Sequence, residues 1–301
     1  KTLFGELMTK SFENREGWIW MNGNFILWKN ATSHIISQGL HYASAVFEGE
    51  RAYNGKIFKS DEHTKRFFKS AKIIGIKIPY SKQEINSAKE ELIKKMNYKD
   101  CYVRPLAWRG GDQMGISTTK SNINVAIAVW DDWASYFKIE DRKAGLKLIT
   151  SPWKRPAPDT APYEAKASGP YIICTMSKEF AETKGYHDAL MLDYRGYVAE
   201  GTGANIFFIK DNEIHTPIPD CFLNGITRQA VIKMTTEQGF KIIERYITPD
   251  EIKNFNEAFL TGTAAEITPI RSIDNINFTT GDNTSTYKFM SDFSELVNSP
   301  N

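Results

Sequence analysis

Apolar and polar residues alternate over short stretches in the first half of the chain, which is the pattern of strands that bury one face. Two pairs of these stretches flank an Asn-Gly dipeptide, which tolerates the positive φ of a tight hairpin turn. The predicted hairpins cover residues 18–28, turning at Asn22-Gly23, and residues 47–58, turning at Asn54-Gly55. Two longer strands are predicted at residues 101–108 and 122–130. The first half therefore predicts a sheet built with hairpins.

Other segments place apolar residues three or four positions apart, as an amphipathic helix requires. Ser81 and Glu84 form a capping-box pattern, Gly75 and Gly239 suit a left-handed C-terminal position, and Pro170 suits a first turn. The predicted helices cover residues 61–74, a segment from Ser81 onwards, and residues 169–183, 227–238 and 286–297, with a short helix after Thr248.

Short strands are predicted between the helices of the second half. They cover residues 146–150, 189–193, 197–200, 204–209, 241–247 and 258–260. Residues 152–162 contain four prolines and are predicted to be irregular or extended. Periodicity fades where charged residues gather at 134–144, which indicates a connector. We therefore predict an α+β fold with a small domain at 1–133, a connector at 134–144 and a large domain at 145–301.

Composition narrows the class of protein. Of the 301 residues, 41% are hydrophobic and 25% are charged, as in globular proteins, and the net charge of +2 favours neither nucleic acid nor a membrane surface as partner. Three scattered cysteines and five histidines lack the spacing of disulfide frameworks or metal sites, so we expect no metal and a reducing compartment. Without a signal-like apolar start or a run of about 20 apolar residues, a cytoplasmic protein is expected.

Lys166 follows the proline-rich stretch and stands among the small residues Ala165, Ala167, Ser168 and Gly169. Small neighbours would let a bulky group pack against the backbone, which a solvated lysine does not need. Most lysines are surface charges, however, so Lys166 by itself is only a candidate covalent or catalytic amine.

Three further segments could bind charged parts of a ligand. Glu200 ends a predicted strand before Gly201 and Gly203, which would let a flat ligand lie against the backbone. Thr227 is predicted to be the N-cap of a helix whose free N–H groups form an anion site. The turn at residues 261–266 could bind an anion as a nest of N–H groups. Each segment alone is more typical of an ordinary strand end, cap or turn.

Two features of the first half suit anionic groups. Arg66 lies on the predicted helix at 61–74 and is the kind of residue that forks onto phosphate, although such arginines more often form surface ion pairs. Tyr102 and Arg104 are two positions apart on one strand, so they share a face on which a phenol and a guanidinium suit a carboxylate. A partly exposed sheet face explains this pair equally well.

In their order and spacing these segments resemble the class IV aminotransferases, the fold-type IV pyridoxal-phosphate enzymes, and among them the bacterial branched-chain aminotransferases. The resemblance covers roughly residues 18–295. The motifs that carry it are Gly39-Leu40-His41-Tyr42, Phe47-Glu48-Gly49, Tyr102-Val103-Arg104-Pro105-Leu106, Met114-Gly115-Ile116, Glu200-Gly201-Thr202-Gly203, Gly225-Ile226-Thr227-Arg228 and Thr261-Gly262-Thr263-Ala264-Ala265-Glu266-Ile267-Thr268-Pro269. One departure is Ala204, where many relatives have Glu.

The resemblance implies a two-domain fold with pyridoxal 5'-phosphate at the domain interface. Lys166 would be the catalytic residue, which holds the cofactor as a Schiff base and moves the substrate proton. The other cofactor-binding residues would be Arg66, Tyr171, Glu200, Ile226, Thr227 and Thr263. The substrate-binding residues would be Tyr42, Phe47, Tyr102, Arg104, Trp133, Tyr136, Thr263 and Ala264. Within these sets, Glu200 would face the ring nitrogen.

The implied reaction is reversible ping-pong amino transfer from leucine, isoleucine or valine to 2-oxoglutarate. Amino acids and 2-oxo acids would therefore be the partners, and Arg104 would serve the γ-carboxylate of glutamate and 2-oxoglutarate. Tyr42 and the loop around Ile116 would come from a neighbouring subunit. That arrangement implies a homo-oligomer with a dimer as its minimum unit, and relatives often form hexamers.

Alternatives on the same fold are a D-amino-acid aminotransferase and an aminodeoxychorismate lyase. D-type relatives tend to carry an Arg-x-His carboxylate trap, which the sequence lacks, and Arg104 is instead followed by Pro105 and Leu106. A lyase would release pyruvate without an amino acceptor. A non-catalytic binding protein that kept the fold would be colourless, whereas a cofactor bound at Lys166 predicts a yellow protein.

Overall fold

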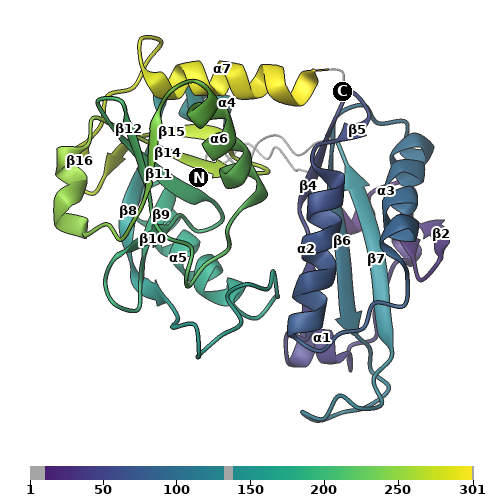
Figure 1. Cartoon of the computed structure of the whole chain (residues 1–301). Helices are drawn as coiled ribbons and strands as arrows, with labels where there is room; N and C mark the ends of the chain where they lie inside the picture. The colour runs from purple at the N-terminus through teal and green to yellow at the C-terminus, as the bar shows by residue number, and fades with distance from the viewer. Residues whose placement is uncertain (1–10, 132–137, 300–301) are drawn as a thin grey trace, which may run out of the picture.

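The computed structural model describes residues 11–131 and 138–299. Its strands form two sheets that lie side by side, one from each half of the chain, and helices cover each sheet (Figure 1). No helix among these residues is both long and apolar enough to cross a membrane. The α+β class predicted from the sequence is confirmed by this mixture of helices and sheets.

The first sheet is antiparallel, with strand order β2-β1-β7-β6-β4-β5 and with β3 paired to β6. Its strands are β1 (Trp18–Met21), β2 (Asn24–Leu27), β3 (Ala45–Phe47), β4 (Glu50–Tyr53), β5 (Lys56–Ile57), β6 (Cys101–Arg109) and β7 (Ile123–Trp130). The helices of this half are η1 (Phe12–Asn14), η2 (Trp28–Asn30), α1 (Gln38–His41), α2 (Ser60–Ile73) and α3 (Lys82–Met96). Along β6, Cys101 and Val103 point into the core under α2 and α3, so Tyr102 and Arg104 take the opposite face.

The second sheet is mixed, with strand order β10-β9-β8-β15-β14-β11-β12-β13 and with β16 paired to β15. Its strands are β8 (Leu146–Arg155), β9 (Asp188–Asp193), β10 (Val198–Glu200), β11 (Asn205–Lys210), β12 (Glu213–Thr216), β13 (Lys241–Glu244), β14 (Glu257–Gly262), β15 (Glu266–Ile273) and β16 (Ile276–Asn277). The helices are α4 (Ile139–Ala144), α5 (Tyr171–Thr183), α6 (Ile226–Glu237), η3 (Pro249–Asn254) and α7 (Ser285–Asn298). Helix α5 packs on β8 and β9, whereas α6 and α7 pack on β14.

The local signals that set the turns and caps are confirmed. Asn22 and Asn54 have φ values of 50°, as the predicted hairpin turns require. The Ser81 side chain accepts a hydrogen bond from Glu84 N, and the Glu84 carboxylate accepts one from Ser81 N, which completes the capping box. Gly75 follows α2 with a φ of 72°.

Several predicted boundaries are wrong. The strand expected at residues 47–53 is two strands, because β3 ends at Phe47 and β4 begins at Glu50. Strand β8 continues to Arg155 instead of ending at 150, and its pairing with β9 shifts register around Pro152, which has no N–H to donate. Conversely, β13 ends at Glu244, before the predicted position 247.

Thr227 is not a helix N-cap. Gly225 holds that position, α6 begins at Ile226, and Thr227 is inside the first turn. Strands β12, β15 and β16 and the short helix α1 were not predicted from the sequence. The domain limits 1–133, 134–144 and 145–301 remain a prediction, and α4 occupies the described end of the expected connector.

Candidate active site

Lys166 lies between β8 and α5, where the chain touches the first sheet. Its carbonyl accepts a hydrogen bond from Phe47 N (3.0 Å), and its N–H donates to Ser70 Oγ (2.9 Å). The small neighbours Ala165 and Ala167 pack into the core of the first sheet. Their small size therefore lets this segment dock closely on β3 and α2, which fixes the backbone of Lys166.

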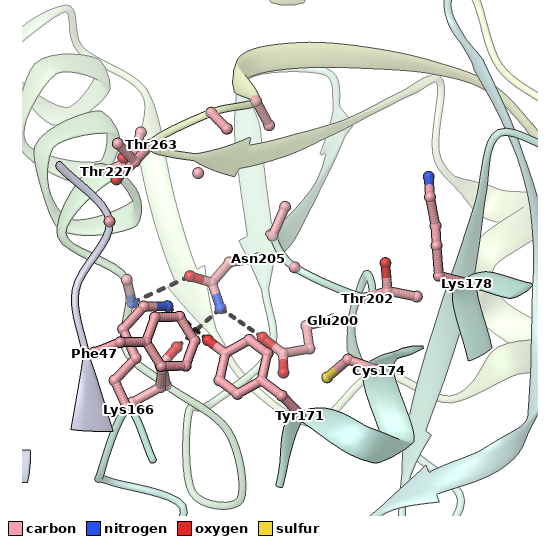
Figure 2. Close-up of a pocket in the computed structure, with 18 of the residues that line it drawn as sticks. Phe47, Lys166, Tyr171, Cys174, Lys178, Glu200, Thr202, Asn205, Thr227 and Thr263 are labelled. Atoms are coloured by element: carbon pink, nitrogen blue, oxygen red, sulfur yellow. Dashed lines mark hydrogen bonds between the residues drawn. The ribbon is translucent and has the colours of Figure 1, made fainter. Parts of the chain in front are cut away.

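The Lys166 amine points into the protein interior (Figure 2). Its Nζ donates a hydrogen bond to Tyr171 Oη (2.6 Å) and lies 4.9 Å from the centroid of the Phe47 ring. Burial, followed by the nearby Arg66 guanidinium, lowers the pKa of Lys166 to about 8. An amine with such a pKa is partly neutral near physiological pH, so it can act as a nucleophile and a base.

Glu200 ends β10 on the other side of the same space. Its Oε1 lies 3.4 Å from Arg155 Nε, and its Oε2 accepts a hydrogen bond from Asn205 Nδ2 at 3.4 Å. Burial raises the pKa of Glu200 to about 7, and the Arg155 charge opposes that rise. The carboxylate is therefore suited to pairing with a cationic or protonated group that enters the cavity.

An anion site forms where α6 begins beside the turn after β14. The first N–H groups of α6 have no intrahelical acceptors, and no side chain caps the helix at Gly225. Thr227 and Thr263 lie close together at this point (Figure 2). The buried Thr261 hydroxyl has no hydrogen-bond partner among the described residues. Uncapped N–H groups, a positive helix end and an unpaired hydroxyl suit a phosphate.

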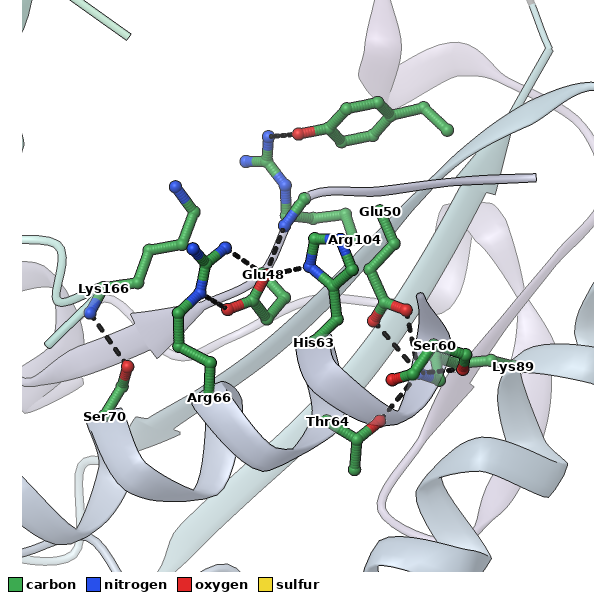
Figure 3. A network of polar contacts seen from close by, with 12 residues as sticks. Glu48, Glu50, Ser60, His63, Thr64, Arg66, Ser70, Lys89, Arg104 and Lys166 are labelled. Atoms are coloured by element: carbon green, nitrogen blue, oxygen red, sulfur yellow. Dashed lines mark hydrogen bonds and ion pairs between the residues drawn. The ribbon is translucent and has the colours of Figure 1, made fainter. Parts of the chain in front are cut away.

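Arg66, on α2, points towards the same space as Lys166 and Glu200. The Glu48 carboxylate binds the Arg66 guanidinium (Figure 3). Its Nε donates to Glu48 Oε1 (2.7 Å) and its Nη2 donates to Glu48 Oε2 (2.9 Å), while His63 Nδ1 lies 2.7 Å from the same carboxylate. Burial raises the pKa of Glu48, but Arg66 and His63 outweigh that effect and hold it well below its ordinary value. Glu48 is therefore ionised and orients the arginine.

The first sheet adds a second group of polar and aromatic side chains. Arg104 Nη2 donates to Tyr102 Oη (3.0 Å), and the Arg104 guanidinium lies 5.0 Å from the Phe47 ring centroid. The Tyr102 ring lies 4.9 Å from that of Trp130. As predicted from their spacing, Tyr102 and Arg104 share one face of β6.

One cavity of about 960 Å³ lies between the two sheets, and it is lined by the start of α6 and by Arg66, Tyr102, Arg104, Lys166 and Glu200. Such a volume is within the range of small-molecule and cofactor pockets. An amine, a buried carboxylate, an arginine and a helix N-terminus thus converge from different elements on a single space.

The family model of amino-transferase class IV matches residues 45–273. The chain belongs to this family. It is 45% identical to a probable branched-chain-amino-acid aminotransferase of Rickettsia bellii, over 89% of this chain and 91% of that protein. It is 42% identical to the branched-chain-amino-acid aminotransferase of Pseudomonas aeruginosa, over 88% and 87%.

Solved structures are also similar to this aminotransferase. A branched-chain amino acid aminotransferase from T.th., solved with pyridoxamine 5'-phosphate, superimposes with a TM-score of 0.90 at 37% identity, covering 94% of this chain and 95% of that one. The resemblance stated from the sequence, the fold type and the enzyme class are therefore confirmed.

Most side chains proposed for the site of this aminotransferase lie around the cavity. They are Phe47, Arg66, Tyr102, Arg104, Lys166, Tyr171, Glu200, Ile226, Thr227, Thr263 and Ala264. Tyr42 is half exposed and does not line the cavity, and Ile116 is exposed by 86%. Trp133 and Tyr136 lie outside the described residues. The individual roles of all these residues remain predictions.

Three residues that hold the others in place were not predicted from the sequence. Glu48 and Asn205 lie in or beside motifs quoted for the resemblance but had no role, and Arg155, the cation beside Glu200, was not considered. The need for a cation near a buried carboxylate was foreseeable, but nothing in the local sequence says which arginine supplies it. Trp130 was predicted only as the end of a strand, and it lines the cavity.

Proposed function

We propose that this aminotransferase transfers the amino group of branched-chain L-amino acids to 2-oxoglutarate, reversibly and by a ping-pong sequence, using pyridoxal 5'-phosphate bound at Lys166. The observation that carries the proposal is the placement of the Lys166 amine and the Glu200 carboxylate around one cavity that also holds an anion site. The 45% and 42% identities to branched-chain aminotransferases support the substrate class.

The residues present fit this cofactor. The uncapped start of α6 and Arg66 suit the phosphate, and so does the Thr261 hydroxyl, which has no hydrogen-bond partner in the described part of the chain. The relative of known structure that contains pyridoxamine 5'-phosphate supports the same cofactor.

When bound, pyridoxal phosphate serves as a sink for the electron pair left when a proton leaves the substrate Cα. The Glu200 carboxylate would hold a proton on the ring nitrogen, which strengthens that sink. Tyr171 would donate to the phenolic oxygen of the ring while its Oη stays close to Lys166 Nζ, as the 2.6 Å contact supports.

The Lys166 amine would then take the proton from the substrate Cα and afterwards give a proton to the cofactor. Its lowered pKa lets the amine act first as base and then as acid. Tyr102, Thr263 and Ala264 would receive the substrate α-carboxylate. The aromatic rings of Phe47, Trp133, Tyr136 and the partner subunit's Tyr42 would enclose the branched side chain, and Arg104 would bind the γ-carboxylate of the second substrate.

A cytoplasmic homo-oligomer, with at least a dimer as its unit, forms part of the proposal. Apolar side chains stay exposed on α1 and on the segments next to it and after β6, namely Ile35, Leu40, Tyr42, Met114 and Ile116. An exposed apolar patch of this kind is typical of an interaction surface. A second subunit seated there would bring its own Tyr42 and Ile116 near the cavity of this one.

The test is an absorbance spectrum of the purified protein before and after L-leucine. We expect visible yellow absorption that L-leucine shifts and 2-oxoglutarate restores. Lys166→Ala, treated with substrate and washed, should be colourless, whereas Lys233→Ala, which removes an exposed lysine of α6, should keep the colour. A response to D-alanine instead of L-leucine, release of pyruvate without an acceptor, or a colourless wild-type protein would refute the proposal.

A further inference from the structure

Asn205 begins β11, and its side chain lies between the two ends of the candidate cofactor site (Figure 2). Its Oδ1 accepts a hydrogen bond from Gly225 N (3.1 Å), directly before α6. Its Nδ2 donates to Leu223 O (3.0 Å) and to Glu200 Oε2 (3.4 Å). The side chain is buried, so one amide contacts the carboxylate at one end of the site and the helix start at the other.

The orientation of this amide is determined by its neighbours. Gly225 N can only donate, whereas Leu223 O can only accept. Exchanging the oxygen and nitrogen of Asn205 would place a donor against the Gly225 donor and an acceptor against the Leu223 acceptor. A single orientation satisfies all three contacts, so the amide is a rigid bridge with a defined direction.

Gly225 shows how close this contact is. A Cβ at position 225 would lie 2.3 Å from Asn205 Oδ1, closer than any side-chain atom can approach. The backbone of Gly225, with φ −60° and ψ 143°, is open to any residue. The glycine is therefore needed for the close approach of Asn205 and not for a special backbone conformation.

We propose that Asn205 is a positioning residue that joins the Glu200 carboxylate to the start of α6, so that the ring-nitrogen end and the phosphate end of the site are held as one unit. The inference rests on the proposed function, because only a ligand with a basic ring nitrogen and a distant anion would contact both ends. Asn205 itself acts through Glu200 and through the N–H groups of α6.

The decisive experiment is a double-mutant cycle of Asn205→Ala and Gly225→Ala. Each protein is titrated with pyridoxal phosphate and, as the apoprotein, with inorganic phosphate. Asn205→Ala should weaken both affinities by about tenfold, the value expected for losing buried hydrogen bonds that involve a charged group. Gly225→Ala should be equally harmful in the wild-type background, because its methyl group displaces Asn205. In the Asn205→Ala background it should add less than about twofold, because the clash is gone.

Two comparison variants separate positioning from general stability. Glu200→Gln should change the pH dependence of the visible spectrum and of kcat while the apoprotein keeps its affinity for inorganic phosphate, whereas Asn205→Ala should change both. Thr216→Val removes a buried hydrogen bond to Ile206 O (2.8 Å) on the neighbouring strand, so it should lower the melting temperature and leave both ends of the site unchanged.

Additive effects of Asn205→Ala and Gly225→Ala would overturn the inference, as would an Asn205→Ala protein with wild-type phosphate affinity and a wild-type pH profile. Failure of the proposed function looks different. In that case the wild-type protein would bind inorganic phosphate without binding pyridoxal phosphate, and the cycle measured with phosphate alone would still decide whether Asn205 and Gly225 are coupled.

Discussion

The Glu48→Gln substitution tests how the chain holds Arg66 in place. The Glu48 carboxylate is fully buried and contacts Arg66 Nε (2.7 Å), Arg66 Nη2 (2.9 Å) and His63 Nδ1 (2.7 Å). Glutamine has the same shape but carries one acceptor oxygen and one donor nitrogen. At least one Arg66 N–H would then face another N–H, and the largely buried guanidinium would lose its counter-charge.

The size and pH dependence of the effect follow from these contacts. Removing one partner of a buried ion pair costs about 3–5 kcal/mol of unfolding free energy. Burial raises the pKa of Glu48, but Arg66 and His63 lower it further, so the net shift is downward from the ordinary value of 4.5. A lowered folded-state pKa stabilises the protein above the unfolded value and loses that effect in acid. The difference between wild type and variant should be constant from about pH 8 to about pH 6 and shrink below 4.5.

Urea denaturation of the apoprotein at several pH values measures this difference directly. Glu164→Gln is the matched control, because Glu164 pairs with Lys69 on the surface and should contribute about 0–1 kcal/mol. Glu48→Gln should also weaken pyridoxal phosphate binding, because the donors of Arg66 lose their fixed direction. An unfolding free energy within about 0.5 kcal/mol of wild type near neutral pH would refute the reasoning, and so would a difference that grows on acidification.

Three further predictions concern residues that line the cavity or lie beside it. Arg104→Ala should raise the KM for 2-oxoglutarate and glutamate at least about tenfold more than the KM for leucine, because only the first two would lose a charged contact. An equal rise in KM for all of these substrates would contradict this role of Arg104. Arg155→Met removes the cation that opposes the raised pKa of Glu200, so the acidic limb of the kcat profile should move to higher pH; superimposable profiles would exclude this role. Glu266→Gly keeps the positive φ of 51° accessible but removes the carboxylate that accepts a hydrogen bond from Tyr53 Oη (2.8 Å). The KM for the substrate should therefore rise about threefold to tenfold while kcat is retained. An unchanged KM would contradict this prediction.

Local signals in the sequence predicted the helices and hairpins well, because their determinants lie within a few residues of one another. Asn22-Gly23, Asn54-Gly55 and the Ser81–Glu84 capping box form the turns and the cap that their chemistry requires. The omission of β15 has an equally local cause. Pro269 lies inside this strand, and a proline normally argues against a central strand. It pairs with Phe259 of β14 just before the parallel pairing with β8 begins at Ile270.

The candidate site was predictable only in part, since periodicity carries no information on which distant residues meet. The local sequence marked Lys166 and Glu200 as candidates, the resemblance implied their roles, and the structure places both around one cavity. The contacts that hold them come from other elements of the fold, as Arg155 and Asn205 show for Glu200. Contacts of this kind depend on the register of the sheets, which a single sequence does not reveal.

The same contacts imply that the site and the junction between the two sheets form together. Lys166 hydrogen-bonds through its backbone to Phe47 and Ser70 of the first half, although it precedes α5 of the second. Glu266, beside the turn that faces the cavity, binds Arg51 and Tyr53 of β4 and also Arg142 of α4 (3.0 Å). A change that separates the sheets would therefore displace the amine and the anion-binding turn at once. Cofactor bound across the cavity would oppose that separation, so cofactor affinity and resistance to unfolding should rise and fall together in variants of this junction.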